Sequence, residues 1–515
     1  MLFKKISTDR LWLAAILLTG LTLRAYRLGE HNLWYDEVVS VYFANSISNL
    51  KNIILDYHPP LYYILLHIWK GFFGRSEFAL RSLSMLFGLL TIPLIYKLGK
   101  RLFNNKAGLA SAFLLSISPL HIWYAQEARA NAISVFLTVL IVYLLYLAID
   151  KNRFIYWLGL WFALLIGVYT NYFILLVPVV ATAFFLQAQH RDKLKKWLIV
   201  SFGALAGFLF WLPFFVKQLV FIRYDSWILR PKPKSIVIAL ENFSAGFNAS
   251  VNIFSIMLVI FSILSFIGII YWFKAKKAQV IFLLCLIFIP VAFIFLISQI
   301  RPVYLSRQLM LLSPFYYLMA ASGLCRIRPS ALKTGFYITI TLLTSICLFN
   351  YFSYRMPSPY IYHEGVFVKK PVKAAADYIK ANLQEKDLVC SSSIYSRKMC
   401  YYLSPEITSE RFPHIITGSK AGRLSLTTRL CYKYAHQMAA VKPIIQIGNQ
   451  AVIPGVKLLG EYDFQRLWLI SPVWSKNDSF SEPFIDEIRF WIRMNYLPLE
   501  RKEFDGILVE LFCKK

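Results

Sequence analysis

Long apolar stretches separated by short polar segments fill about the first 352 residues of the chain. They are about 17 to 23 residues long, the length that an α-helix needs to cross roughly 30 Å of hydrocarbon while satisfying its own backbone hydrogen bonds. The pattern predicts about eleven membrane-spanning helices, near residues 11–27, 78–96, 107–123, 130–149, 154–170, 173–189, 197–216, 252–273, 279–298, 308–324 and 334–352.

The apolar stretch at 59–73 is an exception to this pattern. It is short for a membrane crossing and contains His67 and Lys70, so we expect a helix that lies on the outer membrane surface. If this stretch crossed the membrane, every later loop would change sides.

After the sequence Met-Pro-Ser-Pro at 356–359 the chain becomes mixed and polar for about 160 residues, which is enough for one ordinary domain core. We therefore expect a transmembrane domain at 1–355 and a soluble α/β domain at 356–515. In the second domain the pattern predicts helices at 372–383 and 485–495, and strands at 387–390, 466–470 and 506–512.

The composition supports a polytopic α-helical membrane protein, since 58% of the residues are hydrophobic, 16% are charged and the mean hydropathy is +0.54. The net charge of +29 can indicate a nucleic-acid partner. Basic residues in cytoplasmic loops that face anionic lipid headgroups explain it better. We expect no nucleic-acid partner.

The orientation follows from where the basic residues cluster, around 4–10, 97–106, 151–153, 191–196, 274–277 and 326–333. If all six clusters are cytoplasmic, the N-terminus is cytoplasmic and the domain at 356–515 is extracytoplasmic. Other basic residues, at 223–234, lie in an outer loop, so the assignment rests on cation density in short loops. No small-residue cleavage site follows the first span, and we expect it to remain an anchor in the cell (inner) membrane.

The seven cysteines show neither a CxxC pair nor a metal-ligand spacing. A disulfide among the four in the second domain remains open if that domain is extracytoplasmic: Cys390, Cys400, Cys431 and Cys513. The sequence contains no strong cluster of metal-binding residues. It therefore predicts no certain cofactor and leaves a divalent metal possible.

Several charged and aromatic residues fall on the outer side in this topology. Asp36 and Glu37 are an acidic pair in the sequence Trp-Tyr-Asp-Glu, just beyond the first span. The other candidate residues on this side are Tyr35, His58, Tyr124, Glu127, Arg129, Arg301 and Arg307. Carboxylates, cations and tyrosines are thus predicted to gather at one membrane surface.

The chemistry of such a surface is limited by the donors available there. Nucleotide-activated sugars are normally absent outside the cytoplasmic membrane, so an activated donor must arrive attached to lipid. Arg129, Arg301, Arg307 and His58 could hold the departing lipid phosphate. One carboxylate, Asp36 or Glu127, could deprotonate the acceptor. Direct displacement would invert the anomeric centre of the sugar.

Each of these residues also has an ordinary structural explanation. Asp36 could be the N-cap of a surface helix that begins at Glu37, and Glu37 could be a solvated or helix-terminal charge. His58 precedes two prolines and could be only a loop residue. The basic segment at 223–234 is explained equally well by binding to lipid headgroups.

The chain resembles the GT-C membrane glycosyltransferases, specifically bacterial glycosyltransferase family 39, and is similar to protein O-mannosyltransferases and to the aminoarabinose transferase of lipid A. The segments that carry the resemblance occur in family order. They are Trp-Tyr-Asp-Glu at 34–37, His-Pro-Pro-Leu-Tyr at 58–62, Phe-Ala-Leu-Arg at 78–81, Ser-Pro-Leu-His-Ile-Trp-Tyr-Ala-Gln-Glu-Ala-Arg at 118–129 and Ser-Arg-Gln-Leu at 306–309. The domain at 356–515 resembles the periplasmic domain that ends many of these proteins.

The resemblance implies roles for individual residues. Asp36 would be the general base that activates the acceptor, and Glu127 would be the second acidic position of the family. Arg307 matches an arginine thought to face the lipid phosphate, whereas His58 stands where some relatives have a lysine. A divalent metal is reported for some GT-C members and not for others.

The sequence therefore predicts an integral membrane glycosyltransferase that moves a sugar from a polyprenyl-phosphate donor to a lipid, glycan or protein acceptor on the extracytoplasmic face. Two other functions remain open. A transporter or flippase of a lipid-linked saccharide would use the same arginines, but would place charges near the bilayer midplane. A non-catalytic assembly or receptor protein would bind through its second domain.

Overall fold

The computed structural model describes residues 8–45, 53, 58–185, 188–222, 228–355, 372–384, 387–392, 398–399, 401–403, 444–447, 465–472, 492–504 and 507–514. The chain divides into two compact units. The first comprises Met1–Gly29 and Leu50–Val368, and the second comprises Glu30–Asn49 and Lys369–Lys515.

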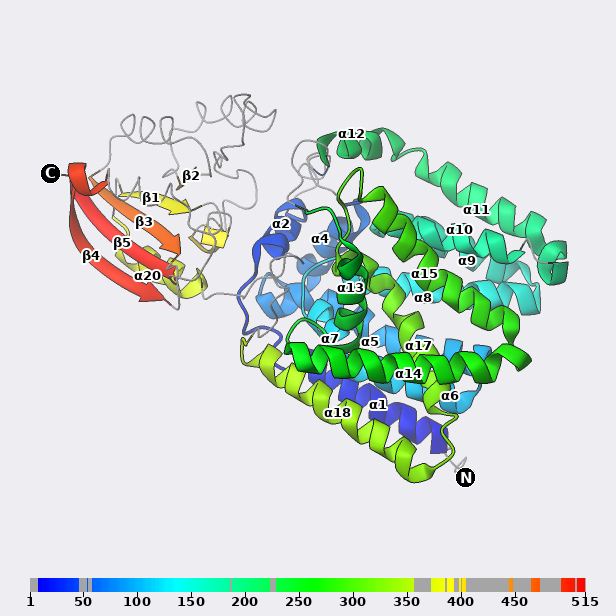
Figure 1. Cartoon of the computed structure of the whole chain (residues 1–515). Coiled ribbons are helices and arrows are strands. Elements are labelled where there is room, and N and C mark those ends of the chain that lie inside the picture. The colour runs from blue at the N-terminus through cyan, green and yellow to red at the C-terminus, as the bar shows by residue number, and fades with distance from the viewer. Residues whose placement is uncertain are drawn as a thin grey trace, which may run out of the picture. The chain divides into compact units, whose positions relative to one another are not determined.

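The first unit is helical throughout its described part (Figure 1). Its elements are α1 (Thr8–Ala25), α4 (Leu61–Phe73), α5 (Glu77–Leu102), α6 (Asn105–Ile117), α7 (Pro119–Ala125), α8 (Asn131–Lys151), α9 (Phe154–Thr170), η2 (Tyr172–Leu175), α10 (Leu176–Phe185), η3 (Ala188–Lys193), α11 (Leu194–Phe208), α12 (Leu212–Ile222), α13 (Pro233–Ala245), α14 (Val251–Ala275), α15 (Lys277–Ile297), α16 (Ser306–Leu309), η4 (Met310–Leu312), α17 (Ser313–Leu324) and α18 (Ser330–Phe352).

Five of the described helices are long and apolar enough to cross a membrane: α5, α8, α14, α15 and α18. The bent pairs α6 with α7 and α11 with α12 raise this number to seven if each pair is one span. The stretch predicted to lie on the membrane surface forms α4, a 13-residue helix that is not among these candidates. The protein is thus a helical membrane protein, and the predicted number of eleven spans stays a prediction.

Two predicted spans are not continuous helices. The span at 107–123 bends by 59° between α6 and α7, and the span at 197–216 bends by 72° between α11 and α12. The first break lies at Pro119, which has no N–H group to continue the hydrogen bonding of α6 and which instead begins α7. Ser118 caps α7, since its side chain accepts a hydrogen bond from His121 N at 3.4 Å.

The core of the first unit is built where helices approach most closely. All twelve residues of α17 are buried, and α17 packs against α14, where Gly268 lies beside Gly323. A Cβ atom on Gly323 would lie 1.8 Å from Leu264 O, so a larger residue would separate the two helices. Close approach at small residues is typical of helix packing in membranes.

The second unit contains a five-stranded sheet in the order β2-β1-β3-β5-β4. Its elements are α2 (Tyr35–Phe43), α20 (Val372–Asn382), β1 (Asp387–Ser392), β2 (Ile444–Ile447), β3 (Arg466–Pro472), β4 (Tyr496–Phe504) and β5 (Ile507–Lys514). Strand β1 runs parallel to β2 and β3, whereas β5 is antiparallel to β3 and β4. Helix α20 packs against β4 and β5 (Figure 1).

The sequence pattern located several of these elements. The helix predicted at 372–383 is α20, and the strands predicted at 387–390, 466–470 and 506–512 correspond to β1, β3 and β5. Most of the helix predicted at 485–495 lies outside the described residues, as does the start of the predicted domain at 356. The boundary between 355 and 356 stays a prediction. That Glu30–Asn49 groups with the second unit was not foreseen.

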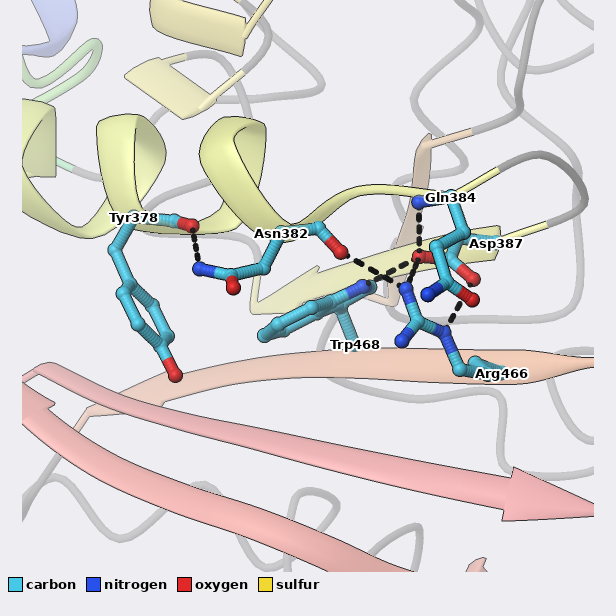
Figure 2. A network of polar contacts seen from close by, with 6 residues as sticks. All are labelled: Tyr378, Asn382, Gln384, Asp387, Arg466 and Trp468. Atoms are coloured by element: carbon cyan, nitrogen blue, oxygen red, sulfur yellow. Dashed lines mark hydrogen bonds and ion pairs between the residues drawn. The ribbon is translucent and has the colours of Figure 1, made fainter.

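An ion pair between the buried Asp387 and the partly exposed Arg466 links α20 to the sheet (Figure 2). The Asp387 carboxylate accepts hydrogen bonds from Arg466 Nη2 at 2.6 Å, Gln384 N at 2.8 Å and Trp468 Nε1 at 3.0 Å. Arg466 Nη2 also donates to Asn382 O at 2.8 Å. Burial alone would raise the pKa of Asp387, but these hydrogen bonds and the charge of Arg466 outweigh it and lower that pKa.

Candidate functional site

In the first unit, Glu127 and Arg129 lie in the short connection between α7 and α8. Glu127 is fully buried, and its Oε1 accepts a hydrogen bond from Trp123 Nε1 at 2.7 Å. The backbone N–H of Arg129 donates to Glu127 O at 2.8 Å, which closes a three-residue turn. We call residues 127–129 the acidic turn.

Arg129 contacts His58, the residue before the proline pair. Arg129 Nη2 lies 3.2 Å from His58 Nε2, and an arginine can only donate, so Nε2 is the acceptor and the ring carries its proton on Nδ1. The carbonyl of Arg129 accepts a hydrogen bond from Ser84 Oγ of α5 at 3.1 Å, and Ser84 Oγ lies 3.1 Å from the Tyr62 hydroxyl of α4. Two segments predicted to lie in separate outer loops thus meet at Arg129.

Gln218 of α12 holds the chain at His58 and was not identified from the sequence. Its Nε2 donates to Ile53 O at 3.0 Å and to His58 O at 3.3 Å. Its Oε1 accepts a hydrogen bond from the Tyr172 hydroxyl at 2.6 Å. The sequence offers only a weak signal for it, a glutamine next to Lys217 in the mainly apolar stretch at 212–222.

Arg301 and Arg307 lie on other elements of the first unit. Arg301 Nη1 donates to Leu219 O at 3.2 Å. Because Leu219 follows Gln218, Arg301 and His58 are both attached to α12. Arg307 lies in α16, where the neighbouring Ser306 accepts a hydrogen bond from Asn242 Nδ2 of α13 at 3.0 Å.

Two further residues of the first unit bear on the predicted site. Tyr124 is buried, with its ring edge-on to Phe247 at 6.0 Å between centroids. Glu241 of α13 is a buried acid that the sequence analysis missed. Burial raises the pKa of Glu241, and the positive charge of Lys234 opposes this change. A glutamate in the otherwise uncharged stretch at 235–245, after the basic segment at 223–234, could have drawn attention to it.

The second unit contains Tyr35, Asp36 and Glu37, in the first turn of α2. Glu37 is buried, and its Oε2 accepts a hydrogen bond from Trp34 N at 3.1 Å, as the third residue of a helix often does. Asp36 is half-buried and Tyr35 is exposed. The suggestion that Asp36 caps a helix beginning at Glu37 is wrong, because the helix begins earlier and Trp34 is its N-cap.

The segment that carries Asp36 is attached within the second unit. Leu33 N donates to the hydroxyl of Tyr402 at 2.7 Å, and both groups are buried. The structure therefore divides the predicted site residues between the two units. It brings Arg129 to His58 in the first unit, and it places Asp36 with the sheet-containing unit.

Among the described residues, no three His, Cys, Asp or Glu side chains lie close enough together to hold a metal ion. Cys513 is a free thiol. Of the other cysteines in the second unit, Cys400 and Cys431 are outside the described residues, and the side chain of Cys390 is not described.

Comparison with known proteins supports the resemblance that the sequence motifs indicated. Residues 57–216 match the family described as dolichyl-phosphate-mannose-protein mannosyltransferase. The chain is also 23% identical over 205 residues to the Bacillus subtilis (strain 168) protein YkcB, whose assignment as a mannosyltransferase is provisional. That alignment covers 37% of this chain and 29% of the length of YkcB.

Solved structures extend the likeness over nearly the whole chain. ArnT from Cupriavidus metallidurans in the apo state superposes with a TM-score of 0.63 at 13% identity, covering 98% of both chains. ArnT bound to undecaprenyl phosphate gives 0.60 at 12% identity, covering 97% of this chain and 98% of that one. The oligosaccharyltransferase AglB from Archaeoglobus fulgidus has been solved in complex with an inhibitory peptide and a dolichol-phosphate. It superposes with a TM-score of 0.54 at 13% identity, covering 99% of this chain and 74% of AglB.

These matches confirm the predicted resemblance to GT-C glycosyltransferases of family 39. The protein has the GT-C fold of a multi-pass membrane protein. The family match includes His58, Tyr124, Glu127 and Arg129 and begins after Asp36.

Proposed function

We propose that the protein is an integral membrane glycosyltransferase that transfers a sugar from a polyprenyl-phosphate-linked donor to a lipid, glycan or protein acceptor. The observation that carries this proposal is the contact between Arg129 and His58 beside the buried Glu127, in a chain with the GT-C fold. Similar structures contain undecaprenyl phosphate in ArnT and a dolichol-phosphate in AglB, which supports a donor of this class.

Arg129 is the proposed ligand of the donor phosphate. A guanidinium group binds phosphate oxygens through two parallel charge-assisted hydrogen bonds. Neutral His58 accepts one hydrogen bond from Arg129 and so orients the guanidinium group. Arg301 and Arg307 are proposed to add positive charge as the leaving phosphate develops negative charge.

Asp36 is the proposed general base, and Glu127 is the second acidic group. In the proposed step the acceptor hydroxyl gives its proton to the Asp36 carboxylate while its oxygen bonds to the anomeric carbon of the sugar. The bond from that carbon to the donor phosphate oxygen breaks, and its electron pair leaves with the polyprenyl phosphate. The sugar configuration inverts because attack and departure occur on opposite faces.

The cellular setting is part of the proposal. The protein would lie in the cell (inner) membrane with its N-terminus in the cytoplasm, and the reaction would occur on the extracytoplasmic face, where lipid-linked donors replace nucleotide sugars. The second unit would then be extracytoplasmic. The sugar, the acceptor and any requirement for a divalent metal are left open.

The proposal is tested by sugar transfer in membranes that contain equal amounts of wild type, Asp36→Asn or Glu127→Gln. Radiolabelled polyprenyl-phosphate sugars are the donors, and label in the acceptor fraction is measured. Loss of a general base lowers the rate by about 100-fold or more, so Asp36→Asn should be nearly inactive. If Asp36→Asn transfers sugar at the wild-type rate, Asp36 is not the base. If wild type transfers from no donor, the proposed function is wrong.

A further inference from the structure

We infer that Arg24, Gln126 and Tyr351 are positioning residues that hold the acidic turn, and with it Glu127 and Arg129, in the geometry that transfer requires. The inference rests on the proposed function and adds three residues that the proposed chemistry does not use. They come from α1, from the link after α7, and from α18. All three are polar and nearly inaccessible, with exposed fractions of 0%, 1% and 4%.

Arg24 completes the end of α6 at the break in the span. The last carbonyl groups of a helix have no partner within that helix, and Pro119 cannot supply an N–H group to extend it. Arg24 Nη1 donates to Ser116 O at 2.8 Å, and Nη2 donates to Leu115 O at 3.1 Å. A cation at this point also interacts favourably with the negative end of the helix dipole. Arg24 thereby stabilises the bend that directs α7 toward the acidic turn.

Gln126 connects the other end of α7 to the same helix. Its Nε2 donates to Arg24 O at 2.9 Å and to Tyr26 O at 2.7 Å. Gln126 immediately precedes Glu127, so these bonds fix the backbone at the start of the acidic turn. The end of α1 therefore contacts both helices: the Arg24 side chain binds carbonyl groups of α6, and the carbonyl groups of Arg24 and Tyr26 accept hydrogen bonds from Gln126 at the end of α7.

Tyr351 closes the arrangement from α18. Its hydroxyl donates to Gln126 Oε1 at 2.8 Å, so that both ends of the Gln126 amide are used. Its ring lies 4.9 Å from that of Trp123, and Trp123 donates to Glu127 Oε1. Tyr351 thus contacts two residues that hold Glu127: Gln126, which directly precedes it, and Trp123, which donates a hydrogen bond to its carboxylate.

The arrangement is more than filling of the core. Polar groups buried at membrane depth are costly, and Arg24 Nε is buried without a hydrogen-bond partner among the described residues. Apolar side chains would pack α1 against α6 without that cost. Here the hydrogen bonds end at the residue beside Glu127. A displacement of about 1 Å at a reacting group can reduce a rate by about 100-fold, so a rigid support at this point has a catalytic use.

The test is the transfer assay with Tyr351→Phe, which removes one hydroxyl and keeps the ring against Trp123. We expect kcat per folded protein to fall about 10-fold or more, because the amide of Gln126 loses one anchor, with little change in Tm. In the background of Glu127→Gln the same substitution should cost almost nothing, since residues that act through one group are non-additive. Arg24→Lys keeps the positive charge but loses the second N–H donor group. It should likewise lower kcat in the wild-type background and have almost no effect in the Glu127→Gln background.

The matched control is Tyr146→Phe, because the buried hydroxyl of Tyr146 in α8 has no hydrogen-bond partner among the described residues. It should leave kcat unchanged. An unchanged kcat in Tyr351→Phe, or an equal loss with and without Glu127, would overturn the inference while the proposed function stands. If wild type transfers no sugar from any donor, the proposed function and this inference both fail.

Discussion

At the scale of single residues, the contact between Arg129 and His58 has the most direct chemical consequence. His58 accepts a hydrogen bond from Arg129 and so orients the guanidinium plane. Unlike a carboxylate, it does not neutralise the positive charge of Arg129. In the proposed function His58 therefore orients the cation and need not supply one itself.

Arg129→Gln should weaken donor binding. A hydrogen bond to a charged group contributes about 1.5 to 3 kcal/mol, which corresponds to a rise of roughly 10- to 150-fold in KM for the polyprenyl-phosphate donor. The rise is measured from initial rates over a range of donor concentrations. Arg101→Gln is the control, since Arg101 pairs with the exposed Asp150 at the surface, and it should leave KM unchanged. An unchanged KM in Arg129→Gln would show that the donor phosphate is bound elsewhere.

The sequence could predict these residues only in part. The acids and cations were recognised because they stand in otherwise apolar surroundings and in segments that resemble a known family. Their partners were not recognised. Trp123 and Gln218 look like ordinary residues of an apolar helix, and their hydrogen bonds to Glu127 and to the chain at His58 depend on how distant helices pack.

At the scale of elements, the breaks in two predicted spans are the main departure from the sequence pattern. Hydropathy records that a stretch is apolar and does not record where its helix ends. The break between α6 and α7 could have been suspected from Pro119, because a proline removes a backbone donor. The bend angle of 59° could not have been predicted from the sequence, because it depends on Arg24 and on the helices that pack around the break.

The element-scale prediction concerns Asp387, whose ion pair joins α20 to β1 and β3 (Figure 2). Asp387→Asn should lower the free energy of unfolding by about 2 to 3 kcal/mol, less than for a fully buried pair, because the Arg466 side chain keeps 18% of its surface exposed. The quantity is obtained from denaturant unfolding of the full chain in detergent. Asp150→Asn, at an exposed ion pair, should cost well under about 1 kcal/mol.

The pH dependence of this stabilisation has a definite sign. The pKa of Asp387 is lower in the folded protein than in the unfolded chain, where it is about 4. The stabilisation is therefore complete above that value and is lost as the pH falls through the folded pKa. Asp387→Asn should lack this acid-dependent loss. If wild type and variant lose stability in parallel as the pH falls, protonation of Asp387 is not the cause of the acid-dependent loss.

At the scale of the whole molecule, the sequence separated an apolar part from a mixed α/β part, and strands β1, β3 and β5 and helix α20 occur where the pattern predicted them. Strands β2 and β4 were not predicted. The sequence did not show that Glu30–Asn49 forms a compact unit with the end of the chain. Chain order hides that association, because it involves a hydrogen bond between Leu33 and Tyr402, which lie 369 residues apart. The proposed base, Asp36, thus belongs to the unit whose role the sequence could not assign.

The most direct test of the central claim is sugar transfer by the purified full-length protein in proteoliposomes. Radiolabelled polyprenyl-phosphate sugars are supplied with acceptors extracted from cell envelopes, and both labelled acceptor and released polyprenyl phosphate are quantified. The account predicts that the two products appear in equal amounts with wild type and that neither forms with Asp36→Asn. Movement of the intact donor between leaflets without either product would contradict it and would indicate a flippase.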